Sequence, residues 1–107
     1  MGINQILARD GQVAERIPAA EEFAGPAAGR VELPNHLCWS GSPVFDVSDP
    51  GDRLTLYTTL IGESQRSDLA RWIHWKHLLV DWPKIRRLTA SDLINVWERL
   101  LPDLTTT

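Results

Sequence analysis

The chain has 107 residues, of which 43% are hydrophobic and 23% are charged, and its formal net charge is −3. This length favours one domain with a small core, and this composition excludes a chain that is disordered throughout. The acidic balance gives no reason to expect general binding to nucleic acid. The single cysteine, Cys38, excludes an internal disulfide and fits a reducing compartment. No apolar run approaches the roughly twenty residues of a membrane span, so we expect a soluble, cytoplasmic protein without membrane contact.

The first thirty residues are predicted to form a flexible acidic N-terminal arm. Pro18 and Pro26 interrupt any long helix, and short helices over 13–17 or 19–23 hold too little apolar surface to stand alone. We expect this arm to be mobile in isolation and to order on a partner, with Phe23 among its apolar anchors. A disordered leader without a role is the alternative.

A β-hairpin is predicted after the arm. Residues 36–39 and 44–47 read as two short strands around the polar turn 40–43, which contains glycine and proline. An isolated hairpin is only marginally stable, so we expect it to pack on helices.

The first long helix is predicted to begin at Ser48-Asp49-Pro50, where a capping side chain precedes a proline in the first turn. Its apolar face would consist of Leu54, Tyr57, Leu60 and Ile61, and Gly62 would end it. A second helix start follows at 64–68, with Ser67 as the better cap.

The stretch from Trp72 to Trp82 carries an apolar stripe of helical spacing, formed by Trp72, Trp75, Leu79 and Trp82. As one straight helix ended by Pro83, residues 68–82 would have apolar positions over roughly 220° of the circumference, more than a small domain covers. Either the helix breaks near His74 or part of this surface belongs to a partner. We expect the break.

The last helix is predicted to start at 89–92 and to end before Pro102, with residues 105–107 as a frayed tail. The fold class that follows is α+β: a small, mostly helical domain over 31–104, with one β-hairpin packed on three or four short helices. Trp72 and Trp97 are expected in its core. Trp75 and Trp82 are the better candidates for a partner surface, since aromatic anchors concentrate binding energy.

The distribution of charge points to the same region. Residues 66–87 carry six basic and two acidic side chains, whereas residues 1–65 carry four basic and nine acidic ones. Arg86 and Arg87 lie at the end of this net-positive segment and are predicted, with Trp75 and Trp82, to form a partner-binding edge. A DNA-binding helix-turn-helix is less favoured, because the outward positions of the last helix are mostly acidic or neutral.

Motifs for chemistry are weak. His36, Cys38, His74 and His77 include every histidine and cysteine of the chain, but neither pair has a recognised zinc-motif spacing, so we expect no metal. The sequence lacks a phosphate-cradling Gly-rich loop and a nucleophile elbow. The aspartates at 46, 49 and 52 fit turns and caps better than paired-carboxylate chemistry. We therefore expect neither an enzyme nor a cofactor.

The chain resembles a group of small, mostly uncharacterised actinobacterial proteins. The resemblance covers about residues 30–104 and implies an antitoxin-like partner of a nucleotidyltransferase-type toxin of the abortive-infection kind. It is carried by Val31-Glu32-Leu33-Pro34, Leu37-x-Trp39-Ser40-Gly41, Phe45-Asp46-x-Ser48-Asp49-Pro50, Arg53-x-x-x-Tyr57, Trp82-Pro83 and Val96-Trp97-Glu98-Arg99-Leu100-Leu101-Pro102.

The function predicted from these features is a non-catalytic protein-binding module, an antitoxin or regulator that binds and masks a partner protein encoded nearby. Its partner-binding residues would be Phe23, Trp75, Trp82, Arg86 and Arg87. The alternative is a DNA-associated transcriptional regulator that uses the basic face of 66–87.

Overall fold

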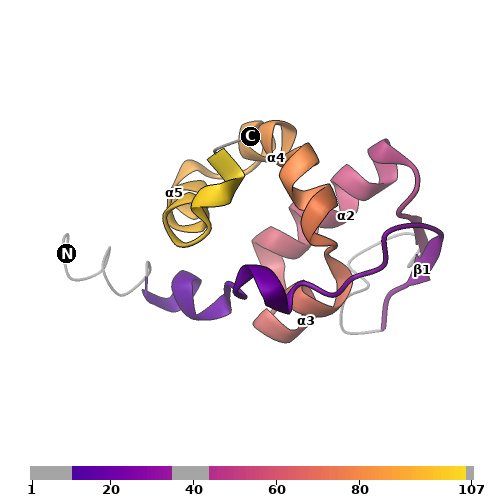
Figure 1. Ribbon diagram of the computed structural model, residues 1–107, viewed down its shortest axis with the longest axis horizontal. Coiled ribbons are helices and arrows are strands. Elements are labelled where there is room, and N and C mark those ends of the chain that lie inside the picture. Colours follow the sequence, from indigo (N-terminus) through magenta and orange to yellow (C-terminus); the bar gives the residue numbers. More distant parts are fainter. Residues whose placement is uncertain (1–10, 35–43, 106–107) are drawn as a thin grey trace.

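The computed structural model describes residues 11–34 and 44–105, and it is mostly helical with one antiparallel β-hairpin, as the α+β prediction requires. Residues 11–16 are helical. The further elements are η1 (Ala20–Glu22), β1 (Arg30–Glu32), β2 (Val44–Asp46), α2 (Pro50–Glu63), α3 (Arg66–Trp72), α4 (Trp75–Leu88), α5 (Ser91–Leu100) and η3 (Pro102–Thr105) (Figure 1).

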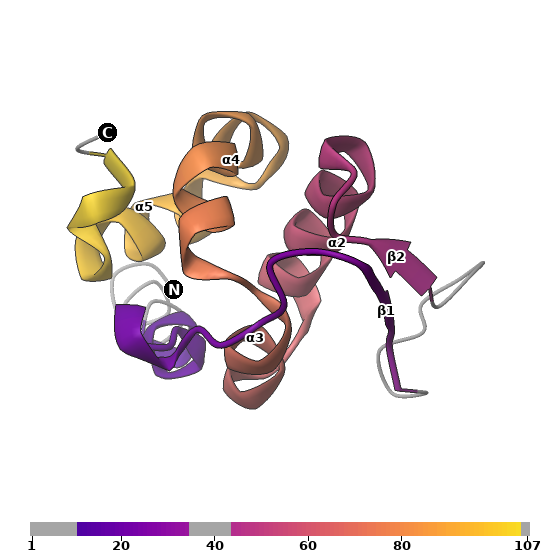
Figure 2. The ribbon, with the colours of Figure 1, turned by 45° about the vertical axis from the view of Figure 1, so that its right-hand side comes forward.

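The helices surround one core, and the hairpin lies at one end of it. β2 packs on α2, which also packs on α3 and α4. η3 folds back onto α4 and α5, at the opposite end of the molecule from the hairpin (Figure 2). The long α2 and α4 thus form the centre of the domain, and each bears a row of buried residues.

The hairpin differs from the predicted one in its first strand. β1 pairs with β2 so that Arg30 lies opposite Asp46 and Glu32 opposite Val44. The strand predicted over 44–47 is therefore present apart from its last residue, but its partner is 30–32 rather than 36–39. The predicted strand 36–39 and its turn lie outside the described residues. Gly29 leads into β1 with φ +89, a left-handed conformation that favours glycine.

The start of α2 is confirmed. Asp49 is its N-cap and accepts a hydrogen bond from the backbone N–H of Asp52 at 2.8 Å, and Pro50 occupies the first turn. The same carboxylates organise the preceding turn, since Asp46 accepts from the backbone of Ser48 and Asp52 from that of Asp46. This is the capping and turn role predicted for the three aspartates.

The predicted break near His74 is also confirmed, because α3 ends at Trp72 and α4 begins at Trp75. Two details were wrong. α3 is capped by Gln65, whose backbone N–H bonds to the carboxylate of Asp68, and not by Ser67. α4 runs through Pro83 to Leu88. A proline inside a helix costs about 3 kcal/mol, and burial of large apolar side chains such as Ile85 beyond it offsets that cost.

The last helix matches its prediction, beginning at Ser91 and ending before Pro102. Val96 and Trp97 are buried at 1% exposure each, as the apolar stripe requires. Thr105 belongs to η3, so the predicted frayed tail is wrong for this residue, and residues 106–107 lie outside the described part of the chain.

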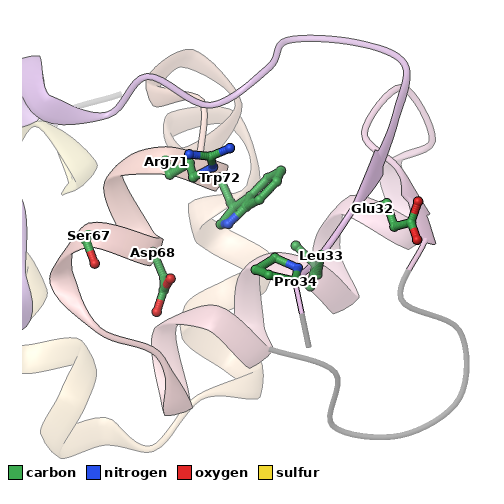
Figure 3. Close-up of a pocket in the computed structure, with 7 residues that line it drawn as sticks. All are labelled: Glu32, Leu33, Pro34, Ser67, Asp68, Arg71 and Trp72. Atoms are coloured by element: carbon green, nitrogen blue, oxygen red, sulfur yellow. The ribbon is translucent and has the colours of Figure 1, made fainter. Parts of the chain in front are cut away.

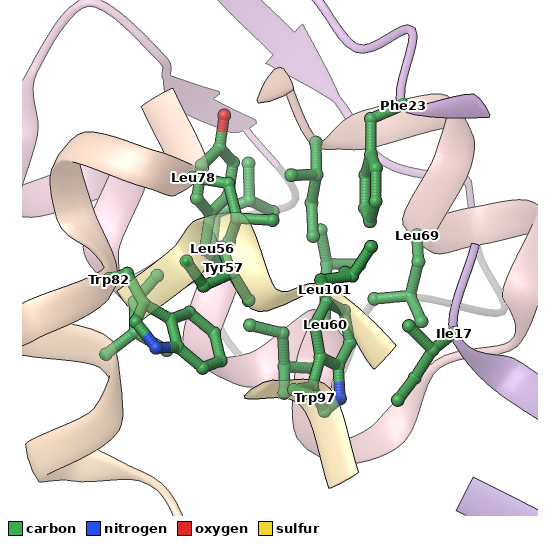
Figure 4. Packing of buried hydrophobic residues seen from close by; sticks show 14 of the residues in the cluster. Ile17, Phe23, Leu56, Tyr57, Leu60, Leu69, Leu78, Trp82, Trp97 and Leu101 are labelled. Atoms are coloured by element: carbon green, nitrogen blue, oxygen red, sulfur yellow. The ribbon is translucent and has the colours of Figure 1, made fainter. Parts of the chain in front are cut away.

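The N-terminal segment contributes to the core. Val13, Ile17 and Phe23 are buried and belong to the same hydrophobic cluster as Leu60 and Trp97. Figure 4 labels Ile17 and Phe23 within this cluster. The expectation of an arm outside the globular domain therefore needs correction for residues 11–30. The short apolar pattern of this segment has too little surface to form a structure alone, and the helices supply the surface that it covers.

Candidate functional site

The outward face of α4 is the candidate site, and the inward face positions it. Leu78, Trp82 and Ile85 recur at helical spacing and are at most 1% exposed, so they fix the rotation of α4 about its axis. Figure 4 shows Leu78 and Trp82 pointing from this helix into the cluster around Tyr57. The opposite face of α4 is thereby turned to solvent.

Asp81 is the only carboxylate of α4, and it is buried. Its two oxygens accept from Nε and Nη2 of Arg53 at 2.6 and 3.0 Å, and both side chains are less than a tenth exposed. This bidentate pair joins α4 to α2. It also removes the single negative charge of α4 from the surface, so the exposed charges of this helix are all positive.

Six of the seven exposed residues of α4, all except Arg86, form one mixed stripe, here called the α4 outer face. At 100° per residue they fall within an arc of about 140°. Val80 and Leu88 are 72% and 65% exposed, the highest values among the exposed large hydrophobic residues of the described chain. The α4 outer face consists of Lys76, Val80, Pro83, Lys84, Arg87 and Leu88.

Helix electrostatics favour only one of the three cations on this face. Lys76 lies in the first turn of α4, where the helix dipole disfavours a cation, and this turn contains no acidic residue. Lys84 and Arg87 are three residues apart, a spacing at which like charges repel by a few tenths of a kcal/mol. Only Arg87, in the last turn, is favoured by the dipole.

Trp82 does not belong to this surface. Its side chain is 1% exposed and packs against Trp97, with ring centroids 6.0 Å apart. Its indole Nε1 donates to the carboxylate of Glu98 at 2.9 Å, and Arg86 donates to the same oxygen at 3.0 Å. The prediction that Trp82 faces a partner is therefore wrong. Arg86 is exposed, as predicted, although its guanidinium already has a carboxylate partner within the chain.

Phe23 and Trp75 lie together, but not as free partner anchors. Their rings stack with centroids 5.5 Å apart, and Phe23 also approaches Trp97 at 6.3 Å. Phe23 is 8% exposed and Trp75 is partly buried. In this structure Phe23 therefore anchors the N-terminal segment to its own domain by packing on Trp75.

Trp72, expected in the core, is only partly buried, whereas Trp97 is in the core as predicted. Trp72 lines a shallow depression with residues of β1 and α3 (Figure 3). The guanidinium of Arg71 lies over its ring at 5.1 Å. Its indole nitrogen is buried without a hydrogen-bond partner. The break before α4 turns Trp72 and Trp82 to different sides, which periodicity over one straight helix does not predict.

His74 and His77 are neighbours, with ring centroids 5.0 Å apart. The ring Nε2 of His77 lies 2.6 Å from the carbonyl oxygen of Ala27. Burial, followed by electrostatic repulsion from His77 and Lys76, lowers the pKa of His74. His36 and Cys38 lie outside the described residues. Within residues 11–34 and 44–105, no group of three or more His, Cys, Asp or Glu side chains is arranged to hold a metal ion.

No protein-family model matches this chain, and comparison with curated proteins and with solved structures finds no significant match. Among the described residues no helix has the length and apolar character needed to cross a membrane.

Proposed function

We propose that this protein is a non-catalytic protein-binding module, an antitoxin or regulator that masks a partner protein, and that the α4 outer face makes the contact. The observation that carries the proposal is the pairing of Val80 and Leu88, both largely exposed, with three cations, two of which the helix dipole does not favour. This revises the surface predicted from sequence. Arg87 remains in it, and Trp82 is replaced by aliphatic residues of the same helix.

The composition of the face defines the partner. Aliphatic side chains gain free energy when they leave water, and the surrounding cations favour a surface of opposite charge. The partner is therefore expected to offer an apolar groove bordered by carboxylates, into which one face of α4 fits. The resemblance to antitoxin-like proteins supports a nucleotidyltransferase-type toxin as this partner.

Co-expression with the product of the adjacent gene, followed by calorimetric titration of the purified pair, tests the proposal. The wild-type chain should form a stable complex. Val80→Ser with Leu88→Gln should weaken it roughly tenfold or more, which corresponds to about 1.4 kcal/mol. Lys84→Glu with Arg87→Glu should weaken it by a similar factor. Val44→Ser, which changes an exposed valine of β2, is the control and should bind like wild type.

The alternative, a DNA-associated regulator, rests on the same cations. A phosphate backbone contacts charges and not exposed aliphatic side chains, so the two functions separate in the variants. DNA binding would be lost in the charge variant, kept in the Val80/Leu88 variant, and would weaken steeply with salt. That pattern, together with no complex with the toxin, would replace the proposed function by the alternative.

A further inference from the structure

The chain changes direction between α3 and α4 without a residue that breaks helices. Residues 69–78 contain neither glycine nor proline, yet Ile73 and His74 are extended, with ψ of 131 and 128. The N-terminal segment crosses this junction, as Figure 2 shows. Contacts from other parts of the chain, rather than the residues of the junction, therefore cause the break.

In a continuous helix the carbonyls of Ala70 and Ile73 would accept from the backbone N–H groups of His74 and His77, four residues on. Here they accept from the N-terminal segment instead. Ala24 donates to the Ala70 carbonyl at 2.8 Å, and Gly25 to the Ile73 carbonyl at 3.0 Å.

One of the four amides that the break releases, those of residues 74–77, has a partner elsewhere in the fold. The backbone N–H of His74 donates to the hydroxyl of the buried Tyr57 at 3.1 Å. Two of the four carbonyls and one of the four amides that helix continuation would pair are thus hydrogen-bonded to other parts of the fold. Since an unpaired buried backbone group costs about as much as a lost hydrogen bond, these contacts hold the break open.

Residues 23–27, here called the strap, fit this junction closely. A Cβ on Gly25 would overlap the carbonyl group of Trp72 and lie 2.6 Å from the backbone nitrogen of Ile73. Phe23 stacks on Trp75 at one end of the strap, and His77 contacts the carbonyl of Ala27 at the other. Only glycine allows the two backbones to approach this far.

We propose that the strap and the α3–α4 junction form a two-state switch: with the strap docked the helix is broken, and with the strap released α3 and α4 join into one helix. The two states exclude each other because the same two carbonyls serve either the strap amides or the amides of His74 and His77. Displacement of the strap is thereby transmitted to the direction of α4. This inference does not depend on what the α4 outer face binds.

The test compares the full-length wild type with Gly25→Ala, Phe23→Ala and Gly11→Ala by NMR. The added Cβ of Gly25→Ala overlaps Trp72, and Phe23→Ala removes the stacked ring. In Gly11→Ala the new Cβ meets nothing within 4 Å, so this variant is the control. The readouts are hydrogen exchange of the amides of residues 24 and 25, and the backbone carbon shifts of Ile73 and His74.

Both strap variants should speed exchange at residues 24 and 25 at least tenfold and move the shifts of Ile73 and His74 to helical values, whereas Gly11→Ala should match wild type. Adding His74→Pro to Gly25→Ala should return the shifts of Ile73 to extended values, since proline has no N–H for the Ala70 carbonyl and disfavours a helical residue before it. Fast strap exchange with Ile73 and His74 still extended would overturn the switch. Unchanged strap exchange, or global unfolding of both strap variants, would overturn it as well, because the strap would then not be a separable element.

Discussion

Arg53 holds Asp81 in a bidentate ion pair, 2.6 and 3.0 Å long, that is buried between α2 and α4. Nη1 of Arg53 also donates to the carbonyl of Val47 at 3.0 Å, which ties the end of the hairpin to the same group. The hydrogen bonds that Arg53 donates to the carboxylate of Asp81 raise the pKa of Arg53 above its already high value. One ionic contact thus connects three elements and orients the face of α4 that points away from it.

Replacing one residue of this pair should lower the free energy of unfolding far more than replacing both. Asp81→Ala leaves a buried guanidinium without its carboxylate and should lower the free energy of unfolding by about 3–5 kcal/mol. The double variant Arg53→Met with Asp81→Leu leaves no buried charge, so its free energy of unfolding should fall much less. Urea denaturation of the three proteins measures the difference, and equal losses in the single and double variants would contradict this account.

The two tryptophans on either side of the break should respond differently to truncation. Trp82→Ala removes a side chain that is 1% exposed and should lower the free energy of unfolding by about 3–5 kcal/mol. Trp72→Ala should lower the free energy of unfolding by clearly less, because this ring is partly exposed in the depression of Figure 3. Thermal or chemical denaturation measures both. A larger loss for Trp72 than for Trp82 would reverse the assignment of core and surface.

Stability should fall as the pH falls through about 6.5. The folded protein lowers the pKa of His74, so below this pH the unfolded chain binds a proton that the folded chain resists. Unfolding midpoints in urea from pH 7.5 to pH 5 measure the effect. His74→Asn keeps a polar residue at the N-cap of α4 but does not titrate, so its midpoint should depend less on pH over this range. An identical pH dependence in both proteins would show that another group is responsible.

Pro83→Ala should stabilise the protein. Pro83 is exposed inside α4 and has no N–H to donate to the carbonyl of Leu79, four residues earlier. Alanine restores this donor and should raise the free energy of unfolding by up to about 3 kcal/mol. Denaturation of the variant tests this, with Lys84→Ala as the neighbouring exposed control. A destabilised Pro83→Ala variant would mean that the proline shapes α4 in a way the fold requires.

The sequence alone identified the elements whose ends are set by local chemistry. Asp49 followed by Pro50 marks the start of α2, and Pro102 marks the limit of α5, because capping and the missing proline N–H act within a few residues. The break near His74 was predicted from a global argument, the excess width of the apolar surface. Its mechanism was not predictable, since the groups that hold it open come from residues 24, 25 and 57, far away along the chain.

In the candidate site, too, some features follow from the sequence and others depend on tertiary contacts. The net-positive character of 66–87 is a property of the sequence. Which apolar residues accompany the charges depends on how α4 is rotated, and that rotation is decided by the buried Arg53–Asp81 pair and by the packing of Trp82 on Trp97. Periodicity defines which residues share a stripe. Only tertiary contacts decide which stripe faces inward, because several apolar stripes compete for a core that is too small to cover them all.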